Sequence, residues 1–72
     1  MPVNFEKAYS LFLRSTDEGD AESARYLGMM FMQGKGVSKN PKKALYWFGV
    51  AAERGDSLAS SNLSRLQTAL EK

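Results

Sequence analysis

The chain has 72 residues, and ten Lys and Arg against eight Asp and Glu leave a net charge of +2. This length allows one small domain, residues 1–72, and the nearly balanced charge favours no class of partner. Because the sequence contains neither His nor Cys, it lacks the common zinc and haem ligands, the usual general base near neutral pH and the thiolate nucleophile. We therefore predict no catalytic activity, no cofactor and no metal site.

The first helix is predicted over residues 5–18. Asn4 is a good N-cap, because its side-chain oxygen can accept a hydrogen bond from an otherwise unpaired backbone N–H. Gly19 is expected to end the helix, since glycine enters the left-handed C-cap conformation without penalty. The helical spacing predicts one buried face, which consists of Phe5, Ala8, Leu11, Phe12, Ser15 and Thr16.

The second helix is predicted over residues 21–32, with Asp20 as its N-cap. Its inward stripe is expected to be Ser23, Ala24, Leu27, Gly28, Met30 and Phe31. Gly28 costs about 1 kcal/mol relative to Ala inside a helix. We interpret it as a point where another backbone comes close. Residues 33–40 contain two glycines and no apolar period, and they form the connecting loop, against which Val37 is expected to tuck.

The third helix has the clearest start, with Asn40 as the N-cap and Pro41 at the first helical position, where its missing N–H costs nothing. It is predicted to reach residue 54, with a buried stripe of Ala44, Trp47, Phe48, Ala51 and Ala52. Gly55 is expected to end it. The fourth helix, residues 57–71, is capped by Asp56, and its apolar stripe is thinner: Ala59, Leu63, Leu66 and Leu70.

The chain is related to itself by a shift of 36 residues. Seven of the 33 comparable positions are identical, among them the caps Asn4 and Asn40 and the Gly-Asp pairs at 19–20 and 55–56. A period in the middle thirties is typical of stacked helical hairpins, whereas an unrelated four-helix bundle gives no reason for the Gly-Asp pair to recur. We divide the domain into a first repeat unit, residues 4–39, and a second unit with a terminating helix, residues 40–72.

The motifs within this period resemble those of the SEL-one-like repeat family. Residues 44–56 read A-x-x-W-F-x-x-A-A-E-R-G-D, and residues 19–22, 27–31 and 34–37 read GDAE, LGMMF and GKGV. The family pattern runs in the same order, from A-x-x-W-[YF] through A-A and G-D-A to L-G and G-x-G-V. Leu11 departs from it where the family has Trp, Ser15 and Thr16 where it has Ala-Ala, and the motif decays after Leu63.

The resemblance implies an all-α fold of two antiparallel helix pairs, stacked as a short right-handed solenoid related to tetratricopeptide repeats. It also implies a non-catalytic protein–protein interaction module that acts as an adaptor, a scaffold or a small inhibitor. Two units are fewer than the three that usually make such an array stable. We therefore predict that the chain self-associates or is stabilised by a partner protein whose identity the sequence does not reveal.

A candidate binding groove follows from the outward face of the first and third helices. With Ala44 at the centre of the core face, the helical wheel places apolar or aromatic side chains where solvent would favour polar ones. The predicted groove residues are Tyr9, Leu13, Arg14, Tyr46 and Val50, which would take a peptide or a partner helix. The alternative is that these side chains pack against one another or against a neighbouring copy. We interpret Trp47 as a core residue rather than a binding hot spot.

The alternative function is contact with nucleic acid through a lysine-rich loop. Lys35, Lys39, Lys42 and Lys43 lie around residues 33–43, and a basic cluster can bind phosphate groups. No aromatic residue is interleaved with them, and a positive charge at the start of a helix is slightly unfavourable. The pattern therefore favours a solvated loop over a nucleic-acid site.

Location is predicted from what the sequence lacks. No stretch reaches the length of a membrane span, so no membrane association is expected. Residues 1–6 have neither the basic nor the apolar region of a signal peptide. If the chain is complete, we expect it to be cytoplasmic.

Overall fold

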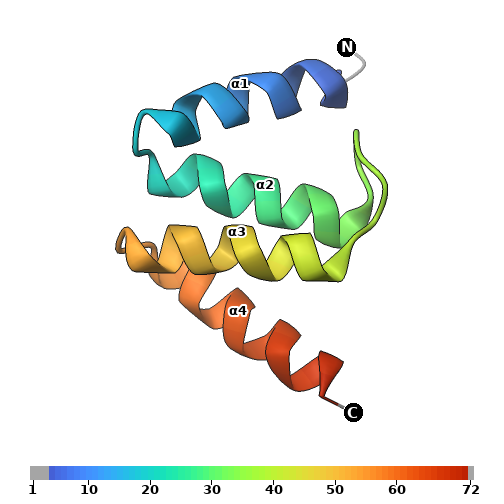
Figure 1. Cartoon of the computed structure of the whole chain (residues 1–72), viewed down its shortest axis with the longest axis vertical. Helices are drawn as coiled ribbons and strands as arrows, with labels where there is room; N and C mark the ends of the chain where they lie inside the picture. Colours follow the sequence, from blue (N-terminus) through green and yellow to red (C-terminus); the bar gives the residue numbers. More distant parts are fainter. Residues whose placement is uncertain (1–3, 72) are drawn as a thin grey trace.

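The computed structural model describes residues 4–71, so the outer ends of the predicted domain, residues 1–3 and 72, lie outside the described residues. Residues 4–71 form an all-α fold of four helices, as predicted (Figure 1). The helices are α1 (Phe5–Asp17), α2 (Ala21–Gln33), α3 (Pro41–Glu53) and α4 (Ser57–Leu70). Each helix ends one residue from its predicted end.

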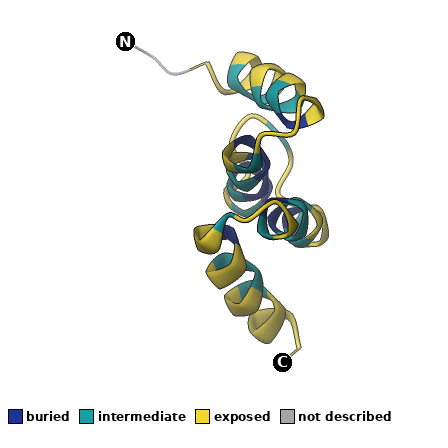
Figure 2. Ribbon diagram, turned by 90° about the vertical axis from the view of Figure 1, so that its left-hand side faces the viewer, coloured by how far each residue is buried: buried dark blue, intermediate teal, exposed yellow. Residues whose placement is uncertain are grey.

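The helices follow one another down the long axis of the molecule, and each runs back along its predecessor (Figure 1). In the view turned by 90°, their order zigzags between two sides (Figure 2). The extensive contacts between helices join α1 with α2, α2 with α3 and α3 with α4, and those between α2 and α3 are the largest. The pairs α1–α2 and α3–α4 are therefore stacked through the contact of α2 with α3, which is the arrangement expected of a repeat solenoid.

Three of the four predicted side-chain N-caps are formed. Asn4, Asn40 and Asp56 each accept a hydrogen bond from the backbone N–H three residues further on, at 3.0, 3.2 and 3.0 Å. The fourth prediction was wrong in its detail. Asp20 occupies the N-cap position of α2 but makes no side-chain cap, because its carboxylate accepts the hydroxyl of Ser23 at 2.5 Å instead.

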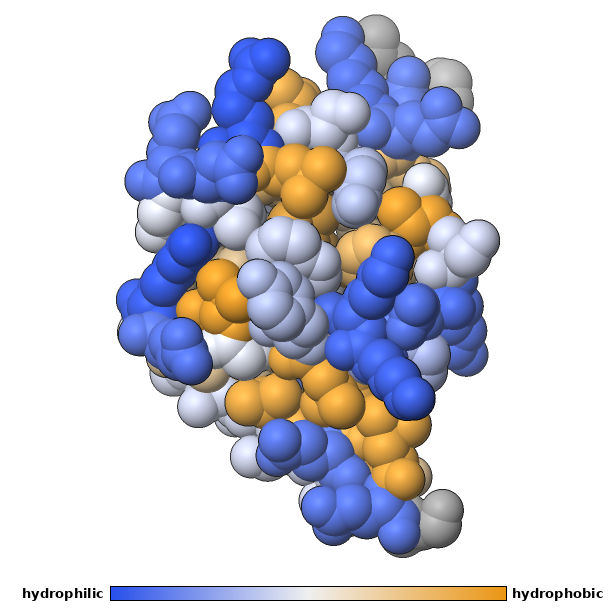
Figure 3. Space-filling view, in the orientation of Figure 1, coloured by the Kyte–Doolittle hydropathy of each residue, from blue (hydrophilic) through white to orange (hydrophobic). Residues whose placement is uncertain are grey.

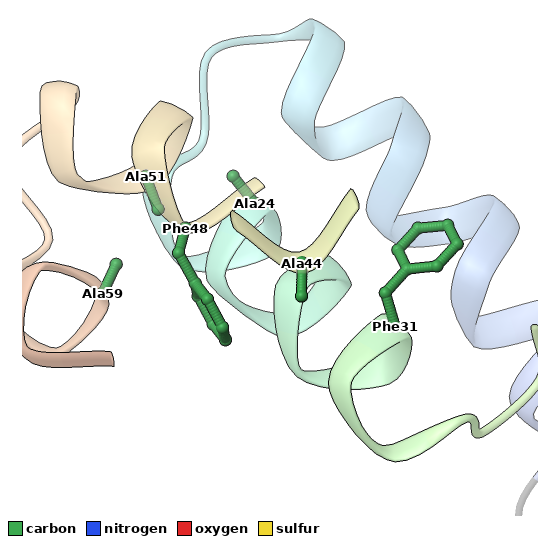
Figure 4. Close-up of a cluster of buried hydrophobic side chains, with 6 residues drawn as sticks. All are labelled: Ala24, Phe31, Ala44, Phe48, Ala51 and Ala59. Carbon is green, nitrogen blue, oxygen red and sulfur yellow. The ribbon is translucent and has the colours of Figure 1, made fainter. Parts of the chain in front are cut away.

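The core is a cluster of two aromatic side chains among four alanines. Figure 4 shows its members on α2, α3 and α4: Ala24, Phe31, Ala44, Phe48, Ala51 and Ala59. Phe48 and Leu27 are the largest fully buried side chains. Because the alanines are short, α2, α3 and the start of α4 approach closely around the ring of Phe48.

Gly28 serves this packing in a way that the sequence did not predict. A Cβ atom at Gly28 would lie 2.6 Å from Cδ1 of Phe48, so the glycine makes room for an aromatic ring. The expectation that another backbone approaches there is wrong. Instead, α3 inserts the ring of Phe48 into a slot that Gly28 leaves on α2.

The predicted buried face of α1 is only partly correct. Thr16 is buried, but Leu11 is 52% exposed and Phe5 lies at the surface. Tyr9, which was predicted to line the outward groove, packs edge-on against Phe31 with 5.9 Å between ring centroids. The predicted buried face of α1 was too wide. Since α1 has an extensive contact with α2 alone, only a narrow stripe of its surface is buried.

Candidate functional site

A hollow of about 580 Å³ lies between α3 and α4. Its walls are formed by Lys42, Leu45, Tyr46, Gly49, Val50 and Glu53 from α3 and by Leu63 and Gln67 from α4. It exists because α4 diverges from α3 towards its C-terminal end (Figure 1). Hydrophobic side chains gather over the part of the surface where α4 lies (Figure 3). The hollow is therefore an open, mixed polar and apolar surface of the size at which ligand sites are found.

Tyr46 is the most exposed large apolar side chain of the described residues, at 63%. Its ring meets that of Trp47 edge-to-face, with the centroids 5.0 Å apart and the planes at 77°. Trp47 is half-buried and packs against the core cluster, as predicted for a core residue. The indole therefore gives Tyr46 a fixed neighbour, which lowers the entropy that this side chain would lose on binding.

Two apolar side chains of the hollow are held in place by the core. Val50 and Leu63 are half-buried and pack against the core cluster from α3 and α4. Lys42 lies near the start of α3 and Glu53 at its end, and both are exposed. At 1.5 Å per residue they stand about 16 Å apart along the helix, so the hollow has opposite charges at its two ends.

The structure brings together only part of the predicted groove. Tyr46 and Val50 lie in the hollow, but none of the three predicted residues of α1 lines it. Tyr9 packs against Phe31, while Leu13 is half-buried and Arg14 exposed elsewhere on α1. The helical wheel missed the contribution of α4, since it shows which side chains point away from a core but not which neighbouring helix they meet.

Sequence reasoning could have found one of the missing wall residues. Leu63 is one of the seven identities of the 36-residue repeat, and its counterpart Leu27 is fully buried. A leucine retained at that position of the repeat predicts an apolar contact on α4. Gln67 gives no such signal, because it is polar and replaces Phe31 of the first unit.

A second, smaller hollow of about 230 Å³ lies on the other side of α4. It is formed by Met32 at the end of α2 and by Asn62, Arg65, Leu66 and Ala69 of α4. Nothing in the sequence predicted it. Leu66 also packs against the core cluster, so this hollow is a seam between α2 and α4 rather than an extension of the first one.

Two arginines tie the second unit to the first. Arg25 of α2 donates from Nε to Oδ2 of Asp56 at 3.0 Å, and the two side chains are 13% and 11% exposed. Arg54 donates from Nη1 to the backbone carbonyl of Thr16 at 2.9 Å, which joins the C-terminal ends of α3 and α1. We call these two interactions the arginine clamps.

The first clamp perturbs both of its partners. Burial disfavours the charged carboxylate of Asp56, but hydrogen bonds from the Ala59 N–H and from Arg25, with the charge of Arg25, outweigh it and lower the pKa of Asp56. Burial likewise disfavours the Arg25 guanidinium, and the pairing with Asp56 again outweighs it and raises the pKa of Arg25. Both groups are therefore held in their charged forms.

The lysines do not form one patch. The Nζ atoms of Lys43 and Lys35 lie over the rings of Phe31 and Phe5, at 5.5 and 5.6 Å from their centroids. Lys42 belongs to the hollow, and Lys39 is exposed in the loop beside Gly34. Two of the four ammonium groups are thus engaged with aromatic rings of the same molecule.

Within residues 4–71, no group of three acidic side chains lies close enough to hold a metal ion. None of the helices described is long and apolar enough to cross a membrane.

These features define a class of protein: a helical repeat array with aromatic rings packed among alanines in its core and an open hollow at one end. The family comparison identifies which repeat it is. The model of the Sel1 repeat matches residues 1–20 and 21–56, which is more than half of the chain, so the chain belongs to the Sel1 repeat family. Sel1 repeats generally act as non-catalytic protein-interaction modules. No solved structure matches the chain.

Proposed function

We propose that this chain is a non-catalytic adaptor or scaffold that binds a partner protein in the hollow between α3 and α4. The observation that carries the proposal is Tyr46, an exposed aromatic side chain at a hollow whose base is apolar. Tyrosine is enriched among the residues that contribute most to protein interfaces. An exposed aromatic beside an apolar hollow commonly marks an interaction site.

The shape of the hollow favours a helix as its occupant. It runs between two helices that diverge, and its apolar wall residues are Leu45, Tyr46 and Val50 on α3 and Leu63 on α4. A third helix can lay an apolar stripe into such a groove, with contacts every three or four residues. The opposite charges of Lys42 and Glu53 at its ends would fix the direction of that helix.

Tyr9, Leu13 and Arg14 do not belong to this surface, and the proposed site therefore consists of Tyr46 and Val50 together with the side chains from α4. The lysine-rich loop carries no second proposal, because two of its ammonium groups lie over aromatic rings.

The proposal is tested by capture of partners from native lysate with wild-type chain and with Tyr46→Asp. We expect at least one protein to be recovered by the wild type and lost with Tyr46→Asp, because the charge would be desolvated in the interface. Leu58→Asp is the matched control, since Leu58 is 60% exposed and lies outside the hollow.

Equal recovery by the wild type and both variants would overturn the hollow as the binding site. Helical circular dichroism of each variant shows that any loss is not caused by unfolding.

A further inference from the structure

The two repeat units meet where α3 packs on α2, and we call this contact the internal joint. The residues that correspond to its two faces lie at opposite ends of the molecule, on α1 and on α4. In that joint, the face of α3 formed by Ala44, Phe48 and Ala51 is fully buried. A shift of 36 residues places these positions on Ala8, Phe12 and Ser15 of α1, which are only half-buried. The same face is thus completely covered in the second unit and partly open in the first, because α2 packs against α3 whereas no described helix occupies the equivalent place beside α1.

The other half of the joint is the face of α2 that receives α3. It consists of Ala24, Gly28 and Phe31, all of them buried: Ala24 and Phe31 share the core cluster with Phe48, and Gly28 lies against its ring. Their counterparts on α4 are Ser60, Ser64 and Gln67. All three are exposed, and Gln67 lines the hollow together with Leu63.

We propose that the exposed face of α4, which borders the hollow at Gln67, receives α1 of a second copy of this chain, in the register in which α3 packs on α2, so that copies add head to tail. This inference rests on the proposed function, since it names a helix that would pack beside the same hollow. It follows from the repeat itself. Among the described helices, α1 is the one that shares the register of α3, with an alanine at 8 and a phenylalanine at 12 in the places of Ala44 and Phe48.

The exposed residues of α1 agree with this assignment. Leu11 occupies the position of Trp47, which is half-buried and packs against the core in the second unit. Leu11 itself is 52% exposed. An apolar side chain that is open in the single chain would be covered in the stack, so its exposure is explained by the missing neighbour.

The intermolecular joint is expected to be weaker than the internal one. Ser64 replaces Gly28, so the slot for an aromatic ring is partly filled by its Cβ. Both arginine clamps are also absent, because Arg54 corresponds to Glu18 and Arg25 to Ser61. Association is therefore reversible and depends on concentration.

Such an interface is heterologous, since it joins different faces of the two copies, and it does not close after two subunits. In sedimentation, the average mass is expected to rise steadily with concentration rather than to level off at the dimer.

The decisive test uses two variants that block opposite ends, Leu11→Lys and Ser64→Lys. Each is expected to raise the dissociation constant at least about tenfold on its own. An equimolar mixture is expected to regain association and stop at the dimer, because the intact α1 of Ser64→Lys fits the intact face of α4 in Leu11→Lys. Both positions are exposed, so folding is retained, and Ser38→Lys in the loop is the control for the added charge.

A variant that strengthens association tests the proposed register between α1 of one copy and α4 of the next. Ser61→Arg would place an arginine opposite Asp20 of the next copy, as Arg25 lies opposite Asp56 within the chain. We expect this variant to lower the dissociation constant about tenfold, and Ser61→Glu to raise it.

Three results would overturn the second copy as the partner of α4. These are a wild-type monomer at concentrations on the order of 1 mM, a mixture of Leu11→Lys and Ser64→Lys that stays monomeric although the wild type associates, and equal effects of Ser61→Arg and Ser61→Glu. If the wild type is monomeric but Tyr46→Asp still loses a protein captured from lysate, the hollow binds another partner and only the second copy on α4 is wrong.

Discussion

At the scale of single residues, the two helical glycines Gly28 and Gly49 have opposite surroundings. A Cβ at Gly28 would meet the fully buried ring of Phe48 at 2.6 Å, whereas a Cβ at Gly49 would have no atom within 4 Å. Both glycines weaken their helices to a similar extent. Only Gly28 has a packing role that compensates for this loss.

Alanine substitution should therefore act in opposite directions at these two sites. We expect Gly28→Ala to reduce the free energy of unfolding by about 1–2 kcal/mol, because overpacking against Phe48 outweighs the better helix propensity. Gly49→Ala is expected to raise it by up to about 1 kcal/mol. Urea unfolding followed by circular dichroism measures both values. Stabilisation by Gly28→Ala would show that the ring of Phe48 can move aside.

At the scale of the elements, the first turn of α4 is held by Asp56. One carboxylate oxygen caps the helix through the Ala59 N–H, and the other accepts from Arg25 of α2. The corresponding Asp20 at the start of α2 has neither interaction and bonds Ser23 instead. The same Gly-Asp pair thus has a purely local role in the first unit and a tertiary role in the second.

The clamp between Arg25 and Asp56 predicts a loss of stability in acid. Because the pKa of Asp56 is lower in the folded chain than in the unfolded one, its contribution is present above the unfolded pKa of about 3.9 and is lost as the pH falls through the folded pKa. We expect Asp56→Asn, which retains an acceptor for the cap, to lose on the order of 1–2 kcal/mol at neutral pH. Below about pH 4 its deficit relative to the wild type should shrink.

Thermal unfolding of both proteins between neutral pH and about pH 2 measures this deficit. A constant difference across the whole range would contradict the assignment, because it would mean that the charge of Asp56 does not contribute.

At the scale of the whole molecule, stability is concentrated in the middle of the stack. α2 and α3 each pack on two neighbours, whereas α1 and α4 have an extensive contact with only one. In such arrays each unit is stabilised mainly by its nearest neighbours. The outer helices, and above all the exposed second half of α4, depend on whatever covers the ends.

The protection of backbone amides from hydrogen exchange should decrease from the middle of the stack towards its ends. In dilute solution we expect the amides of α2 and α3 to be the most protected, those of α1 less protected, and those of residues 65–70 the least, because local opening of an outer helix exposes less apolar surface. Exchange resolved by residue or by peptide measures it. Uniform protection across the helices would indicate that the chain unfolds only as one cooperative unit.

Much of the fold was accessible from the sequence, because it is encoded locally. Caps such as Asn40, the left-handed Gly19 and Gly55, and the period of the apolar residues mark helix ends to within one residue. The candidate site was less accessible. Tyr46 and Val50 lie together in a hollow, but its far wall comes from α4, and a wheel drawn on one helix carries no information about the angle of its neighbour.

By itself, then, the sequence determined the helices, their order and the repeat family, because helix caps and 3.6-residue periodicity act between residues close in the chain. Only the tertiary structure decided which faces remain open. The slot that Gly28 offers to Phe48 and the clamps made by Arg25 and Arg54 depend on contacts between residues 20 to 38 positions apart. Packing at such separations is set by the three-dimensional fit of side chains, which no local pattern records.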